Sequence, residues 1–236
     1  MSRACASAKE WGYLEHNPAS GVRLPHKHPI RPKVTLRPFE VREILNRLEE
    51  PHRTMVLLIA VTGMRVSELL GLQWPDIDFE RRLFHVRRTF YRGSFGLPKT
   101  QASERVIPMS DGLFFVLERH KRNVRKSALA LVFPNADGKL YEAANLLKRL
   151  LHPALAKCGL PKTGWRVFRR SVATALSEMG EPVRTAQQVL GHSSPHTTLA
   201  FYTQSVEESQ RRAISRLEEI MFPNVPKFEV GSSLIH

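Results

Sequence analysis

The spacing of hydrophobic residues along the chain predicts a mostly helical protein. In residues 37–50 the apolar side chains recur at helical spacing, as in an amphipathic helix. Residues 53–63 are apolar on nearly every side and predict a buried helix that ends at Gly63. The same pattern predicts helices within residues 2–14, 64–74, 113–117, 146–151, 168–179, 183–190 and 206–220.

The period of the pattern changes from helical to two in the segment "RRLFHVRRTF". Leu83 and His85 alternate there with Phe84 and Val86, which predicts a β-strand. A partner strand is expected at "SERVIPM", joined to the first through the basic hairpin "YRGSFGLPKTQA". We therefore expect a fold that is mainly α with a small antiparallel sheet, in the α+β class.

The charge of the chain narrows the choice of partner. Its 236 residues include 36 Lys and Arg against 22 Asp and Glu, which gives a formal net charge of +14. An excess of this size favours nucleic acid or an acidic membrane surface as the partner, and it carries no information about the fold. Sequence motifs are needed to decide between nucleic acid and a membrane surface.

Hydropathy and cysteine usage indicate the compartment. No stretch reaches the ~18–20 apolar residues that a membrane span requires, and the N-terminus lacks the apolar core of a signal peptide. Cys5 and Cys158 lie far apart and form no CxxC pair, so they indicate neither a zinc knuckle nor a disulfide framework. We expect a cytoplasmic protein that is not bound to a membrane.

Four segments carry side chains suited to chemistry on a phosphodiester. They are "TGMRVSELLGL" with Arg65, "GLPKTQASERVIPM" with Lys99, "WRVFRRSVATAL" with Arg166 and Arg169, and "LGHSSPHTTLAFYT" with His192 and Tyr202. Each also has an ordinary explanation taken alone: a helix ion pair, a solvated lysine, a helix cap or a core residue. Their combination is what points to one reaction.

These residue types match the needs of a phosphodiester attacked by a protein oxygen. Arginine binds phosphate through two parallel hydrogen bonds and stays charged, so it can stabilise the negative charge that develops on the oxygens. A lysine can protonate the leaving 5′ oxygen, a histidine can bond the phosphate, and a tyrosine beside cations can act as the nucleophile. Neither a metal nor a cofactor is then required. His192 and His196 have metal-ligand spacing, but Pro195 lies between them.

The four segments resemble the catalytic domain of the tyrosine recombinases, also called phage integrases. "TGMRVSELLGLQW" is similar to the first box of the family, the "PKT" at Lys99 to its hairpin lysine, and "LGHSS…TTLAFYT" to its third box and nucleophile. The second box is usually His-x-x-Arg followed by His or Arg. The resemblance covers residues 36–217, with the boxes in the family's order.

The resemblance implies a role for each matching position. Arg65 and Arg169 would be the two arginines that clamp the phosphate, and Lys99 the general acid. His192 would be the histidine of the third box. Tyr202 would be the nucleophile that forms a 3′-phosphotyrosyl link to DNA.

Two further positions follow from the resemblance. Glu68 matches the acidic residue of the first box and would brace the site rather than react. Arg166 stands where the family usually has histidine or lysine; it can donate to phosphate oxygens but hardly deprotonates, so we expect it to lower activity.

The resemblance also divides the chain. Residues 1–35 would comprise the last helix of an N-terminal core-binding domain and a basic, Pro-rich linker, which leaves either a fragment or a shortened product of a decayed gene. Residues 36–222 would form the catalytic domain and residues 223–236 a tail. The expected partners are double-stranded DNA and further copies of the chain, in a tetrameric synapse.

The function we expect is site-specific DNA recombination or integration. A degenerate relative that binds DNA without productive recombination remains the alternative, and a topoisomerase-like nicking and closing enzyme a third possibility.

Overall fold

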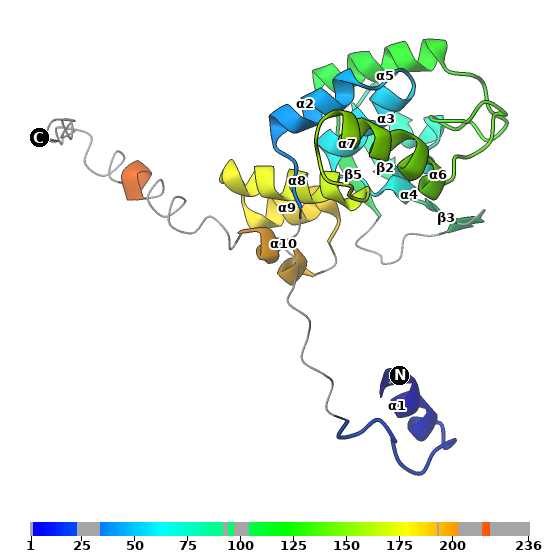
Figure 1. The fold of residues 1–236 in the computed structure, drawn as a ribbon, viewed down its shortest axis with the longest axis vertical. Coiled ribbons are helices and arrows are strands. Elements are labelled where there is room, and N and C mark those ends of the chain that lie inside the picture. Colours follow the sequence, from blue (N-terminus) through cyan, green and yellow to red (C-terminus); the bar gives the residue numbers. More distant parts are fainter. Residues whose placement is uncertain are drawn as a thin grey trace, which may run out of the picture. The chain divides into compact units, whose positions relative to one another are not determined.

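The computed structural model describes residues 2–22, 34–91, 94–96, 104–192, 194–202 and 214–217 (Figure 1). The chain divides into two compact units, Met1–Lys33 and Val34–His236. The first unit contains helix α1 (Ser2–Glu10), which ends earlier than predicted because Gly12 adopts the left-handed backbone conformation, with a φ of 78°. Most of the predicted linker, residues 23–33, lies outside the described residues.

The second unit begins with three helices that build one wall of its core. They are α2 (Pro38–Asn46), α3 (His52–Thr62) and the short α4 (Val66–Leu70). Helix α3 is buried through Met55, Val56, Leu58 and Ile59, as its nearly uninterrupted apolar sequence predicts. The helical stretch predicted for residues 64–74 is only five residues of α-helix, followed by a 3₁₀ turn at Trp74–Asp76.

A three-stranded antiparallel sheet follows, in the order β1 (Ile77–Asp78), β2 (Leu83–Val86) and β5 (Arg105–Pro108). The predicted pairing of the two basic strands is confirmed, with Phe84 opposite Ile107 and Val86 opposite Arg105. A second, two-stranded sheet of β3 (Thr89–Tyr91) and β4 (Ser94–Gly96) was not predicted.

Helices make up most of the remainder of the unit. They are α5 (Asp111–Asn123), α6 (Ala143–Leu146), a π-helical turn (Leu147–Leu151), α7 (His152–Lys157), α8 (Arg166–Glu178), α9 (Val183–Leu190) and α10 (Pro195–Tyr202). Figure 1 shows α8, α9 and α10 gathered at one end of the unit and α5 at the other. Of the helix predicted at 206–220, only residues 214–217 are described, and these are helical. The tail predicted at 223–236 lies outside the described residues.

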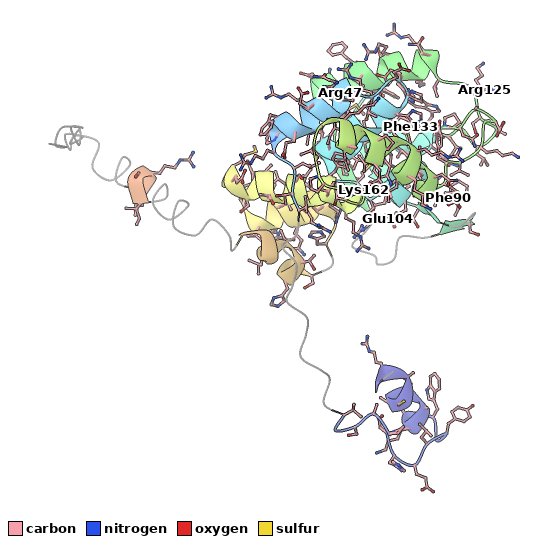
Figure 2. All side chains as sticks on the ribbon, in the orientation of Figure 1. Arg47, Phe90, Glu104, Arg125, Phe133 and Lys162 are labelled. Atoms are coloured by element: carbon pink, nitrogen blue, oxygen red, sulfur yellow. The ribbon has the colours of Figure 1, made fainter. Side chains whose placement is uncertain are left out.

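The core lies between the helices and the three-stranded sheet. Phe84 of β2, Phe168 of α8 and Phe133 are fully buried there, and Figure 2 labels Phe133 in the interior. A smaller cluster of Val172, Ala173 and Leu190 packs α8 against α9. Within the described ranges, no helix is both long enough and apolar enough to cross a bilayer.

Candidate active site

Arg65 lies at the turn between α3 and α4. Helix α3 ends because Gly63 takes the left-handed conformation, with a φ of 63°, and Arg65 then forms the extended N-cap of α4. The Glu68 carboxylate accepts the backbone N–H of Arg65 at 2.9 Å, and its other oxygen accepts Nη1 of the same residue at 2.5 Å. Glu68 thus caps the helix and holds the Arg65 side chain, which remains 38% exposed.

Glu68 is buried between two arginines. Its side chain is 1% exposed, and Oε2 also accepts Nη2 of Arg105 at 3.0 Å. Burial acts to raise the pKa of this carboxyl, but Arg105 and Arg65 outweigh burial, so the pKa of Glu68 lies below its ordinary value. Glu68 is therefore ionised at neutral pH and accepts hydrogen bonds from both arginines.

Arg169 lies in the second turn of α8 and is buried. Its Nη1 donates to the carbonyl oxygen of Gly63 at 2.8 Å, and its Nη2 donates to the carbonyl oxygen of Leu190. These bonds connect the end of α3 to the end of α9 through one side chain. Arg166, one turn earlier on the same helix, is exposed.

The surroundings of Arg169 carry excess positive charge. Burial, and then the charge of Arg65, lower the pKa of Arg169 to about 9; Glu68 acts against this shift, while Arg105 and Arg166 add to it. A guanidinium with a pKa this far below its ordinary value lies where an added negative charge would be stabilised.

His192 follows α9, which ends at Gly191 with a φ of 62°. Its ring nitrogen Nδ1 lies 2.9 Å from Oγ1 of Thr198, a buried residue of α10, and its carbonyl oxygen accepts Nε2 of Gln187 at 3.0 Å. Burial, followed by the charges of Arg169, Arg65 and Arg105, lowers the pKa of His192 to about 4. The imidazole is therefore neutral at pH 7, and its Nδ1 is engaged by Thr198.

The structure brings three of the six predicted site residues into one cluster. Arg65, Arg169 and His192 meet at the end of α9, where Nη2 of Arg65 also lies 3.5 Å from the carbonyl oxygen of Gly191. Lys99 lies outside the described residues. Tyr202 is the last residue of α10, and the structure describes its backbone only.

Two contributors to the cluster, Arg105 and Thr198, were not predicted. The side chain of Arg105 is 6% exposed, and its Nε donates to the carbonyl oxygen of Val189 at 2.9 Å. One signal was present in the sequence: in "RVIP" the alternation of a strand places Arg105 on the same side as Ile107, which is buried. An arginine in phase with a core residue requires a buried partner.

The sequence profile of the phage integrase family matches residues 34–209. The chain belongs to this family. The resemblance drawn from the four segments is thereby confirmed, and the four arginines and the histidine described above all lie inside the matched region of this family member.

Known phage integrases and recombinases resemble the chain at moderate identity. The tyrosine recombinase XerC-like protein of Caldanaerobacter subterraneus subsp. tengcongensis is 29% identical over 90% of this chain and 62% of its own length. The tyrosine recombinase XerD of Staphylococcus saprophyticus is 30% identical over 74% of this chain and 59% of its own. The chain thus spans about three fifths of the length of these relatives.

Solved structures confirm the fold class. The integrase of transposon Tn1549, in complex with a circular intermediate DNA, superposes with a TM-score of 0.74 at 25% identity, over 91% of this chain and 78% of that one. The XerA recombinase gives a TM-score of 0.62 at 22% identity, over 82% and 66% of the two chains. The predicted mainly helical fold with a small antiparallel sheet is the fold of this family.

Proposed function

We propose that this chain supplies the catalytic domain of a site-specific tyrosine recombinase, which cleaves and rejoins double-stranded DNA. One observation carries the proposal most strongly: positive side chains converge at the end of α9, where the charge of Glu68 acts against them only in part. Together with burial, this charge depresses the pKa of both Arg169 and His192. A phosphodiester bound at this point would supply the negative charge that the cluster lacks.

The proposed cleavage step divides the work among these side chains. Arg65 and Arg169 bind the non-bridging oxygens, and neutral His192 donates from Nε2 to one of them. The Tyr202 hydroxyl gives its proton to water and attacks phosphorus, the bond from phosphorus to the 5′ oxygen breaks, and Lys99 gives a proton to that departing oxygen. The product is a 3′-phosphotyrosyl link and a free 5′ hydroxyl, and the reverse attack by a 5′ hydroxyl rejoins the strand.

The cluster supports chemistry without a metal ion or other cofactor, because guanidinium groups can stabilise the charge on phosphate. We propose residues 36–222 as the catalytic domain. The partners we propose are double-stranded DNA in the cytoplasm and further copies of the chain in a synapse. The net charge of +14 and the recombinase relatives support these assignments.

Tyr202 is tested by trapping the covalent intermediate. On a nicked suicide duplex, the full chain in excess EDTA should form a protein–DNA adduct. Tyr202→Phe should abolish the adduct because phenylalanine lacks the attacking oxygen. Tyr141→Phe is the matched control: Tyr141 contacts His52 edge-on, with ring centroids 5.7 Å apart, away from the cluster, and the adduct should form at the wild-type rate. An adduct that persists in Tyr202→Phe would refute the assignment.

The alternative is DNA binding without productive cleavage, and Arg166 is the observation that favours it. Arg166 is exposed, and a guanidinium group hardly deprotonates, so it cannot relay a proton as histidine can. The trapping assay supports this alternative if the duplex binds to the chain and no adduct accumulates.

A further inference from the structure

Arg105 is a buried cation at the start of β5 that none of the steps above uses. It faces Val86 of β2 in the sheet and shares a side of its strand with Ile107 of the core. Figure 2 labels the residue before it, Glu104. Burying a guanidinium is costly, so its contacts must compensate that cost.

Those contacts reach Glu68 at the cap of α4 and the backbone at the end of α9. Nη2 of Arg105 bonds Oε2 of Glu68 at 3.0 Å, and Nε donates to the carbonyl oxygen of Val189 at 2.9 Å. The aliphatic part of the side chain packs under Gly191: a Cβ at that position would lie 2.8 Å from Cδ of Arg105. One side chain therefore touches the cap of α4 and the end of α9.

We propose that Arg105 is a positioning residue for strand cleavage, holding Glu68 and the end of α9 so that Arg65 and His192 face the same phosphate. The inference rests on the proposed function for its catalytic consequence. The path to Arg65 runs through Glu68, whose two oxygens hold the Arg65 side chain and backbone N–H. The path to His192 runs through Val189 and Gly191, the residues just before it.

The two contacts of Arg105 require the planar guanidinium group of arginine. Nη2 and Nε project from one rigid plane, so the distance between the Glu68 carboxylate and the Val189 carbonyl is fixed when both are bonded. A lysine at this position would keep the positive charge but supply one ammonium that cannot reproduce both directions. Charge and geometry can therefore be separated by substitution.

The experiment compares Arg105→Lys and Arg105→Gln with a matched pair elsewhere in the fold. Arg88 bonds the buried Asp76 at 3.0 Å, and the other oxygen of Asp76 accepts the backbone N–H of Gln73 at 3.0 Å, so here too a buried carboxylate bonds both an arginine and a backbone N–H that it caps. Arg88→Lys and Arg88→Gln thus control for the loss of a capping ion pair. Each full-length variant is assayed for adduct formation in a single turnover, DNA affinity, thermal unfolding and the pKa of His192 by NMR.

We expect both Arg105 variants to slow adduct formation roughly 10- to 100-fold, since small displacements of catalytic groups carry penalties of this order. DNA affinity should change much less, because Arg105 is buried. His192 faces Arg169 from α8, Arg65 from the cap of α4 and Arg105 from β5. Its pKa should therefore rise in Arg105→Gln and rise less in Arg105→Lys. The Arg88 variants should keep both the rate and the His192 pKa.

Several results would overturn the proposal. Folded Arg105→Lys that forms adduct at the wild-type rate would do so, as would a loss of rate no larger than in the Arg88 variants. An unchanged His192 pKa in folded Arg105→Gln would exclude the contact with the end of α9. If Arg105→Gln does not fold, Arg105→Lys carries the test by rate. If the wild-type chain forms no adduct, the proposed function fails, while the His192 pKa still decides whether Arg105 shapes the cluster.

Discussion

Arg169 shows that a single side chain in this site serves both folding and binding. It is buried, yet it stays protonated at neutral pH because a pKa of about 9 still lies above 7. Its bonds to the carbonyl oxygens of Gly63 and Leu190 compensate part of the desolvation. The rest of the cost persists in the free protein, and a bound phosphate would lower it.

The low pKa of His192 makes the stability of the folded chain depend on pH. Its pKa is about 4 in the folded chain and, by its ordinary value, about 6.5 in the unfolded chain, so between these limits the unfolded chain binds more protons. Stability should therefore fall as pH drops from about 6.5 towards 4. Urea unfolding of the wild type and His192→Gln at pH 7 and pH 5 measures this. The wild type should lose more stability than the variant, and equal losses would contradict the low pKa.

The sequence identifies the side chains of the site better than it identifies the contacts between them. Arg65, Arg169 and His192 can be recognised because each lies in a segment typical of the family. The partner of Arg105, Glu68, is 37 residues away, and no local pattern links the two. Thr198 likewise could not be predicted, because a threonine in an apolar helix is common and only the fold brings it to His192.

Helix ends, more than helix interiors, position the cluster. Gly63 ends α3 and Gly191 ends α9, both with positive φ, and Arg65 and His192 come within two residues after them. The apolar run of residues 53–63 and the glycine after it made α3 predictable. The three-residue strands β3 and β4 were not, because so few residues do not establish a period of two.

Gly63 can be tested against a second glycine of the same conformation. Alanine at Gly63 would be strained by its φ of 63° and would place Cβ 2.6 Å from Cδ2 of Leu190. Alanine at Gly180, φ 78°, carries the strain with nothing within 4 Å. Gly180→Ala should cost about 1–2 kcal/mol. Gly63→Ala should cost about 2–5 kcal/mol, because overpacking adds ~1–3 kcal/mol to the strain.

Denaturant unfolding of the two glycine variants measures the difference. Equal destabilisation would mean that Leu190 moves aside without cost and that the contact between α3 and α9 is loose. Gly63→Ala should also slow adduct formation, since the Gly63 carbonyl oxygen is bonded by Arg169.

The whole molecule combines a charge suited to DNA with a compact unit that presents the cluster at one end. The net charge indicates a class of partner, but it could not locate a contact surface, since basic residues occur throughout the sequence. The pairing of β2 with β5 and the apolar helices were predictable because each has a clear period. How α8, α9 and α10 come together was not, because their contacts join distant parts of the chain.

Binding of DNA should depend strongly on salt and weakly on base sequence. Each phosphate neutralised releases counterions, so the logarithm of affinity should fall by about 0.9 per log unit of salt for every such contact. Arg166→Gln should reduce that slope by about 0.9, if exposed Arg166 meets a phosphate. Arg125→Gln is the control, because Arg125 follows α5 at the other end of the unit and bonds the Ala136 carbonyl oxygen (Figure 2).

Titration of labelled duplexes of several sequences at a series of salt concentrations gives the slopes. Tight binding to one sequence that persists at high salt would show that base readout, and not phosphate contact, dominates.

The two carbonyl bonds of Arg169 also bear on how this family changes over time. A copy of the gene released from selection for recombination would still have to fold, and Arg169 joins the end of α3 to the end of α9. Selection for folding alone should then retain Arg169 and its neighbours Glu68 and Arg105, while exposed Arg166 is free to drift. The arginines that mark the family most clearly would thus be among the last features to disappear from an inactive descendant.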